Sequence, residues 1–347
     1  MQNSNPFTIL FGTKPGCFIS RVSECQKVIG DFEGKENPST VYMLTGIRGS
    51  GKTVLMTELS EYFESREWIV IDAVPTSDII DNIVSRLAGE KSLEGIIKKA
   101  DINVSVLGIN IGMSDNTPKI NSETILRKML DVLKKSERRI LITIDEVANN
   151  EYIRNFVAVY QNLIRKGYPI FLLMTGLYDN IYDLQNEKQL TFLYRAPKIF
   201  LKPLDIDLMT TEYKKILNIS LRQAREMALL TKGYSFAFQM LGYIYWDNGG
   251  KEDIDSILPD YDYALREYSY DKIWSELSEK DKEILDELSK YEIAKVKDIR
   301  EKLNISSAAF SVYRDRLYRK GLIDTSVYGS ISLVLPRFKE FLEYKLM

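Results

Sequence analysis

The sequence predicts an α/β fold: a parallel sheet with crossover helices, then a small helical domain and a C-terminal winged helix-turn-helix domain. The first 200 residues alternate short apolar runs with amphipathic stretches. From Asp205 to about Tyr270 the pattern is helical, and after Leu277 it changes to three helices and a hairpin. We therefore expect three domains in the 347 residues, at 1–204, 205–270 and 275–347.

Five apolar runs are the predicted strands of the sheet. Each is rich in β-branched or aromatic residues and almost wholly apolar, as a strand buried on both faces must be. The runs are STVYMLTG (39–46), WIVIDAVP (68–75), RRILITIDE (138–146), PIFLLMTG (169–176) and PKIFLKPL (197–204). Helical patterns separate them, at 53–65, 77–88, 122–135, 151–166 and 178–191. Strands that alternate with helices in this way predict parallel pairing.

One segment interrupts the alternation. DINVSVLGINIGMS, Asp101–Ser114, alternates apolar Ile102, Val104 and Val106 with polar residues and then passes Gly108. The pattern favours a β-hairpin inserted between the second and third strands. A plain surface insertion is an equal alternative.

The C-terminal segment carries the pattern of a winged helix-turn-helix. Three helical stretches precede two short strands, with Ser278 before the first helix, Gly321 after the third and Tyr328–Gly329 between the strands. The helices are expected at 277–290, 295–303 and 307–320, and the strands at 322–327 and 330–335. The helical domain before it has candidate helices at 207–218, 220–233, 236–247 and 262–274.

Composition excludes several classes of function. The chain has no histidine and only two cysteines, Cys17 and Cys25, which argues against histidine catalysis, a structural zinc site or a disulfide framework. The formal net charge of -2 gives no global attraction to nucleic acid, so any DNA contact must come from a local basic patch. We expect a cytoplasmic protein, since the N-terminus does not resemble a signal peptide and no apolar run is long enough to span a membrane.

A phosphate-binding motif follows the first predicted strand. GIRGSGKT, Gly46–Thr53, fits the P-loop pattern GxxxxGK[ST] between a strand and a helix. Glycines there let backbone amides turn towards phosphate oxygens, and the N-terminus of the following helix adds a favourable field. Lys52 is expected to reach the β and γ phosphates, and Thr53 to donate its hydroxyl oxygen to Mg²⁺. The predicted contacts to ATP are Gly46, Arg48, Gly49, Ser50, Gly51, Lys52 and Thr53.

An acidic pair ends the third predicted strand. ILITIDE delivers Asp145 and Glu146 to the carboxyl edge of the sheet, where open α/β sheets bind their ligands. Asp145 is expected to hold Mg²⁺, usually through water, and Glu146 to polarise the attacking water. Beside a P-loop, this pattern indicates ATP hydrolysis rather than an ordinary strand end.

Two further residues have functional and plain interpretations of equal weight. Thr175 ends the fourth strand, where its hydroxyl is placed to orient water near the γ-phosphate or simply to begin a turn. Arg195 precedes the last strand, where it is placed to reach a neighbouring subunit's phosphate or to form an ordinary surface ion pair.

The third helix of the winged segment is the predicted recognition helix. Phe310, Tyr313 and Leu317 share one face and should belong to the core. The candidate DNA-binding residues on the other faces are Ser307, Ser311, Arg314, Arg316, Tyr318, Arg319 and Lys320. A basic helix of this kind suits phosphate contacts and the major groove of double-stranded DNA. A protein-docking winged helix is the alternative.

These motifs together resemble the AAA+ ATPases, in the branch that contains origin-recognition-type initiators, archaeal-type ATPases and STAND switches. NPF, FISRVSE, GIRGSGKT, LITIDE, MTG and YRAPKIFLKPL occur in the order of that branch, before the winged helix. The resemblance implies an AAA+ core, a helical lid and Walker roles for the P-loop and acidic pair. It also implies that Arg21 lies near the adenine, that Thr175 is sensor 1 and that Arg195 is an arginine finger.

The sequence departs from the family at several of these motifs. Ser20 replaces the family's usual glycine, and Thr175 replaces a commoner asparagine. In the lid segment GYSFAFQ, Ser235 occupies the position where proline is usual. No arginine stands at a convincing sensor 2 position. We therefore expect slow hydrolysis, as in a nucleotide-dependent switch, with ATP-dependent self-association if Arg195 acts between subunits.

Three functions are consistent with these observations. The first is a DNA-associated AAA+ ATPase whose winged helix holds duplex DNA. The second is a STAND-like signalling or defence switch, in which the winged helix docks protein and no DNA is bound. The third is a remodelling ATPase that acts on protein.

Overall fold

The structure is a computed structural model of the chain. It describes residues 4–9, 14–34, 38–90, 93, 121–250 and 253–346. The predicted insertion at Asp101–Ser114 lies outside these residues. Packing divides the chain into two compact units, which are Val22–Thr45 with Leu55–Ile199, and Met1–Arg21 with Gly46–Val54 and Phe200–Met347. The division into three domains stays a prediction.

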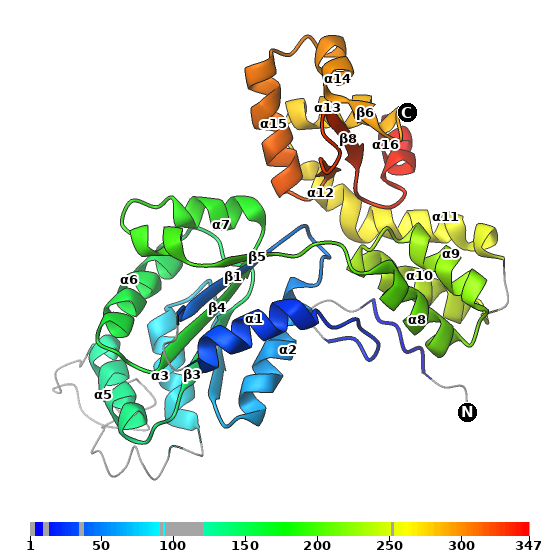
Figure 1. The fold of residues 1–347 in the computed structure, drawn as a ribbon. Helices are drawn as coiled ribbons and strands as arrows, with labels where there is room; N and C mark the ends of the chain where they lie inside the picture. The colour runs from blue at the N-terminus through cyan, green and yellow to red at the C-terminus, as the bar shows by residue number, and fades with distance from the viewer. Residues whose placement is uncertain are drawn as a thin grey trace. The chain divides into compact units, whose positions relative to one another are not determined.

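The first of these units carries the parallel sheet (Figure 1). Its strands are β1 (Val41–Thr45), β2 (Ile69–Asp72), β3 (Ile140–Ile144), β4 (Ile170–Gly176) and β5 (Lys198–Phe200), in the order β2-β3-β4-β1-β5. The pairs β2–β3, β3–β4 and β1–β4 are parallel, as the sequence predicts. Because parallel strands end at one edge, the P-loop after β1 and the acidic pair after β3 both begin at carboxyl ends of the sheet.

Helices cover both faces of the sheet (Figure 1), which explains why β1, β3 and β4 are buried at every position. The helices of this unit are α1 (Val22–Glu33), α2 (Lys52–Ser65, which enters the unit at Leu55), α3 (Ile79–Gly89), α5 (Ser122–Lys135), α6 (Glu151–Arg165) and α7 (Tyr178–Gln185). On one face, Met43 and Leu172 share a core with α3, α5 and α6. On the other, Phe171 packs against Phe32 of α1 and against Trp68, just before β2.

Side-chain caps fix where three of these helices begin. Asp78 accepts from Ile80 and Asp81 before α3, Asn121 accepts from Glu123 before α5, and Asn150 accepts from Ile153 before α6. The predicted helix 178–191 is shorter in the structure. It ends at Gln185, and a separate 3₁₀ turn, η3 (Thr191–Arg195), follows.

The second unit begins with a helical part. Its elements are α8 (Ile206–Leu217), α9 (Leu221–Leu230), α10 (Ser235–Asp247), α11 (Ile254–Leu265), a π-helical turn η4 (Arg266–Tyr270) and α12 (Asp271–Ser275). The N-terminal segment packs into it, since Phe7 lies 5.8 Å from Phe238, ring centre to ring centre, and Gln239 donates to the carbonyl of Cys17. Gly242 is required there, because a Cβ on it would lie 2.5 Å from the Phe7 ring.

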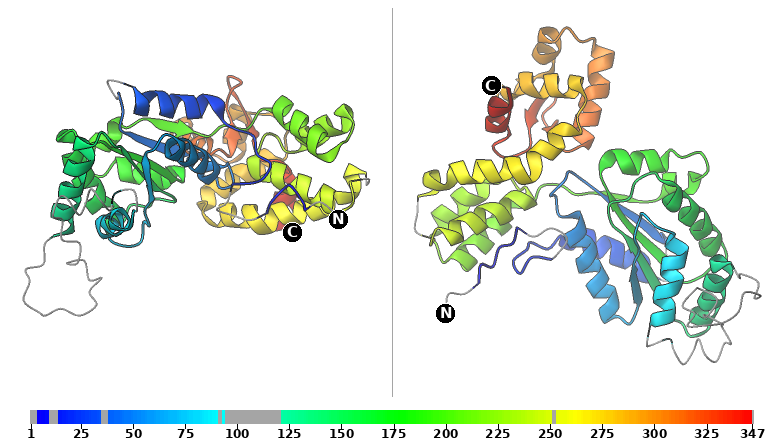
Figure 2. Two further views of the ribbon diagram at one scale, coloured as in Figure 1. Left: turned by 90° about the horizontal axis from the view of Figure 1, so that it is seen from below. Right: turned by 180° about the vertical axis from the view of Figure 1, so that it is seen from behind.

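The winged part of this unit confirms the predicted three helices and hairpin (Figure 2). Its elements are α13 (Glu279–Ser289), β6 (Ala294–Lys295), α14 (Val296–Lys302), α15 (Ser307–Arg319), β7 (Ile323–Asp324), β8 (Ser330–Leu333) and a further helix, α16 (Phe338–Leu346). Phe310 and Leu317 are buried as predicted, and Tyr313 packs partly buried beside them. The helical and winged parts share one hydrophobic core.

None of the helices in the described ranges has both the length and the apolar character that crossing a bilayer requires.

Candidate functional site

The P-loop has a backbone that only glycine accommodates. Gly49 and Gly51 have φ values of +74° and +90°, in the left-handed region. A Cβ on Gly49 would lie 2.4 Å from Tyr234 Oη, and one on Gly46 would lie 2.8 Å from Ser50 Oγ. The glycine spacing of the motif therefore matches real steric demands of the loop.

The polar groups of the loop fit a phosphate. Lys52, the first residue of α2, donates from Nζ to the carbonyls of Gly46 and Ile47 at 3.0 Å each. Ser50 Oγ is buried with no hydrogen-bond partner within the described residues. An ammonium group, a buried hydroxyl and a helix N-terminus together form a set of groups that binds anions. Thr53 follows Lys52 in α2 and carries the hydroxyl that the motif assigns to Mg²⁺.

Residues from other parts of the same unit donate hydrogen bonds to the backbone carbonyl oxygens of the P-loop. Arg21 Nη2 and Ser235 Oγ both donate to the carbonyl of Ser50 at 3.0 Å. Tyr234 Oη donates to the carbonyl of Arg48 at 2.7 Å, and the Phe236 amide donates to that of Gly49 at 3.1 Å. The structure thus brings the predicted residue Arg21 to the P-loop.

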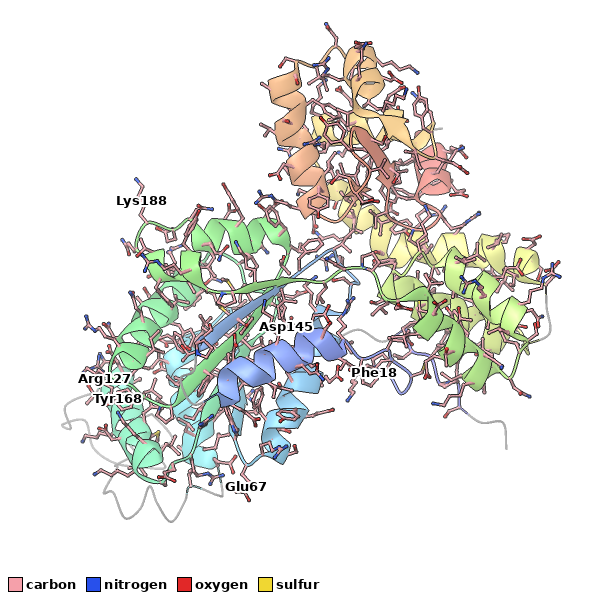
Figure 3. All side chains as sticks on the ribbon, viewed as in Figure 1. Phe18, Glu67, Arg127, Asp145, Tyr168 and Lys188 are labelled. Atoms are coloured by element: carbon pink, nitrogen blue, oxygen red, sulfur yellow. The ribbon has the colours of Figure 1, made fainter. Side chains whose placement is uncertain are left out.

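The acidic pair and Thr175 lie together in the sheet unit. Asp145 directly follows β3 (Figure 3), and Thr175 lies in the neighbouring strand β4. Thr175 Oγ1 donates to Asp145 Oδ1 and accepts from the Glu146 amide at 3.1 Å. Glu146 has a φ of +52°, which is unusual for a residue with a side chain and is often found at functional sites. Thr175 thus orients the segment that carries both acids.

Arg195 lies at the end of η3 and is exposed. Its neighbour Tyr194 is 70% exposed, so this turn presents a cation and an aromatic ring on the surface of the sheet unit. The position is compatible with a contact between subunits and with a plain surface arginine.

The predicted DNA-binding residues of α15 fall into two groups. Ser307, Ser311, Tyr318 and Arg319 are exposed, and Arg314 and Lys320 are half-buried. Arg316 instead donates from Nη2 to Asp281 Oδ1 at 2.6 Å and to Ser278 Oγ at 3.0 Å. Since the Asp281 side chain is buried, Arg316 has a structural partner within the winged part.

Sequence reasoning missed the roles of Tyr234, Ser269 and Glu276. Tyr234 Oη lies 2.7 Å from Ser269 Oγ, and Arg48 Nη2 lies 3.3 Å from Glu276 Oε1. Ser235 offered a local signal, because it replaces the proline of the proteins that the motifs resemble, and its hydroxyl bonds the P-loop. The pairs to Arg48 carry no such local signal, since they join residues far apart in the chain.

Comparisons with known proteins agree with this fold. A family described as a domain of unknown function, DUF8462, matches residues 267–342. No curated protein matches the chain. The Aeropyrum pernix ORC2 protein in its ADPNP–ADP complexes is similar, with a TM-score of 0.60, 15% identity, and 96% of each chain covered. Its ADP form has a TM-score of 0.50 and 13% identity, again over 96% of each chain.

At such low identity the likeness concerns the fold alone. The chain has the α/β fold of the Aeropyrum pernix ORC2 protein, which agrees with the predicted fold class.

Proposed function

We propose that this chain, with the fold of origin-recognition-like AAA+ ATPases, binds ATP with Mg²⁺, hydrolyses it slowly and acts as a nucleotide-dependent switch. The observation that carries the proposal is the P-loop, whose left-handed Gly49 and Gly51 precede Lys52 at the start of α2. The ORC2 structure that it resembles holds ADPNP and ADP, which supports the same ligand class here.

Each residue of the proposed site has a distinct task. The loop amides and Lys52 bind the phosphates, while Thr53 and Asp145 offer the hard oxygen ligands that suit Mg²⁺. Mg²⁺, when bound, neutralises charge on the phosphate oxygens. Glu146 polarises the attacking water, and Thr175 holds the Glu146 backbone through its hydroxyl.

We attribute slow hydrolysis to the residues at the start of α10, which offer no positive charge to the P-loop. The lid segment Gly233–Gln239 contains no cationic residue. Ser235 and Phe236 instead use a hydroxyl and a backbone amide to bond P-loop carbonyls. A site that lacks one positive charge near the transferred phosphoryl group stabilises the transition state less, so turnover is slow.

The winged part is proposed to bind double-stranded DNA through α15. Arg314, Arg319 and Lys320 lie on the helix outside its core face, and such cations provide the phosphate contacts that dominate affinity. Arg316 is a weaker candidate because its guanidinium pairs with the buried Asp281.

A protein-docking winged helix, as in a STAND-like switch, is the second candidate. It is favoured by apolar exposure, since Val312 on α15 is 64% exposed, and Val327 and Tyr328 are exposed between β7 and β8. The hairpin segment 322–333 contains no lysine or arginine that could reach a groove of DNA. Binding to duplex DNA separates the two candidates.

Two substitutions test the proposed ATPase. Lys52→Ala removes the ammonium and should abolish or greatly weaken ATP binding in a folded protein, as measured by isothermal titration. Glu146→Gln should bind ATP with normal affinity and lose hydrolysis. Unchanged ATP affinity in Lys52→Ala overturns the binding site, and wild-type turnover in Glu146→Gln overturns the role of the carboxylate.

A further inference from the structure

Tyr234 joins the P-loop to the helical part through a buried hydroxyl. Its Oη donates to the carbonyl of Arg48 and lies 2.7 Å from Ser269 Oγ, so both of its bonds are made inside the protein. Burial raises the pKa of Tyr234 above its usual value, so the hydroxyl stays a neutral donor. A buried hydroxyl that loses its partner carries the full cost of desolvation, so Tyr234 and the Arg48 carbonyl are expected to move together.

The contacts continue from Tyr234 into the winged part. Ser269 lies in the π-helical turn η4, a type of element often found at functional sites. Tyr270, next to it, stacks on Tyr234 with ring centres 6.5 Å apart. Tyr270 Oη donates to the carbonyl of Pro336 at 2.6 Å, and its ring packs against Phe338 of α16.

A second set of contacts joins the same loop to the winged part. Arg48 Nη2 lies 3.3 Å from Glu276 Oε1, in the segment between α12 and α13. A Cβ added to Gly321, just after α15, would lie 3.5 Å from Ile47 Cβ. Of two successive P-loop residues, Ile47 therefore lies beside the turn that follows α15, and Arg48 pairs with the segment that precedes α13.

We propose that Tyr234 is a positioning residue that makes the winged part respond to nucleotide at the P-loop. The inference rests on the proposed ATP binding and adds the route by which the bound nucleotide is sensed. A phosphate that draws Lys52 Nζ away from the carbonyls of Gly46 and Ile47 acts on the segment that Tyr234 holds. The linked pairs Tyr234–Ser269 and Tyr270–Pro336 then pass that shift to α16.

Tyr234→Phe tests the inference because it removes one oxygen and keeps the ring. Hydrogen exchange of the full chain is measured with and without a non-hydrolysable ATP analogue and Mg²⁺, at saturation for each variant. In the wild type the analogue should change exchange in α15, β8 and α16. In Tyr234→Phe that difference should fall at least twofold, and ATP affinity should weaken about two- to twelvefold, the worth of one buried hydrogen bond.

Tyr213→Phe is the matched control. Tyr213 is also buried and donates from its hydroxyl to the carbonyl of Phe238 at 2.7 Å, a bond within the helical part. It should keep the nucleotide-dependent difference. Ser269→Ala removes the other partner of Tyr234 and should reduce the difference as Tyr234→Phe does.

The outcomes separate this inference from the proposed function. If the wild type binds the analogue and exchange in the winged part does not change, the inference is overturned while ATP binding stands. An equal loss in Tyr213→Phe also overturns it, because general loosening would then explain the effect. If titration shows that the wild type binds no ATP, both fail together.

Discussion

At the residue scale, Gly49 shows how the P-loop depends on its surroundings. Its φ of +74° alone would strain any other residue, and a Cβ there would also meet Tyr234 Oη and Phe236 Cβ. Gly249 offers the matched comparison, since its φ is +79° and nothing lies within 4 Å of an added Cβ. An alanine at either position would adopt a strained backbone, but only the alanine at position 49 would also clash with neighbouring atoms.

Gly49→Ala should therefore destabilise the fold by about 1–3 kcal/mol and lower ATP affinity more than tenfold. Gly249→Ala should cost about 1 kcal/mol and leave ATP affinity unchanged. Thermal unfolding and isothermal titration measure the two effects. Normal ATP affinity in a folded Gly49→Ala protein would show that the loop does not need this conformation to bind phosphate.

At the scale of elements, α15 contains arginines of two kinds. Arg316 neutralises the buried Asp281, whereas Arg319 pairs with the exposed Asp315 and is held only weakly by it.

Arg314→Ala combined with Arg319→Ala should weaken duplex DNA binding, flatten its salt dependence and leave stability nearly unchanged. Arg316→Ala should instead lower stability by about 1–3 kcal/mol, since it leaves the buried Asp281 carboxylate with a hydrogen bond from Ser278 and no cation. DNA titrations over a salt series and urea unfolding distinguish these results, and equal effects of all three arginines on stability would contradict the division.

Patterns of burial made most elements predictable. The five strands lie within the apolar runs that the sequence predicts, and burial on both faces makes the central strands β1, β3 and β4 almost wholly apolar. Helix α5 has the predicted bounds Ser122–Lys135. Helix α7 is shorter than predicted because tertiary contacts decide its end: Gln185 donates to the Leu193 carbonyl as the chain turns back. Helix α16 went unpredicted, although Phe338, Phe341 and Leu342 have helical spacing.

The sequence motifs identify the residues of the candidate site, but they do not reveal which of these residues contact one another or other parts of the chain. The P-loop, Asp145, Glu146 and Thr175 have local sequence signals, and the structure joins Thr175 to the acidic pair. The bonds from Tyr234 to Arg48 and from Arg48 to Glu276 join residues 186 and 228 positions apart. Such pairs depend on the packing of whole elements, and a single sequence carries no pattern that reports them.

At the scale of the whole molecule, the proposed ATP-dependent assembly is tested at Arg195. If Arg195 reaches the nucleotide of a neighbouring subunit, a non-hydrolysable ATP analogue should increase the molar mass seen by light scattering. Arg195→Ala should lower the ATPase rate about tenfold or more, since arginine fingers stabilise transition-state charge. Lys188→Ala removes another exposed cation of the sheet unit and should have no effect. A monomer at every concentration, with normal hydrolysis by Arg195→Ala, would exclude a finger at this position.

Under the proposed function, ATP at the P-loop controls what the winged part binds. The most direct test measures duplex DNA affinity of the wild type and Lys52→Ala over a salt series, with and without ATP and Mg²⁺. We predict that the wild type binds DNA with a steep salt dependence and that ATP changes its affinity at least fivefold, while Lys52→Ala binds DNA equally well in both conditions. A nucleotide-dependent DNA switch would be contradicted if the intact protein bound no duplex DNA at low salt, or if ATP left its DNA affinity unchanged.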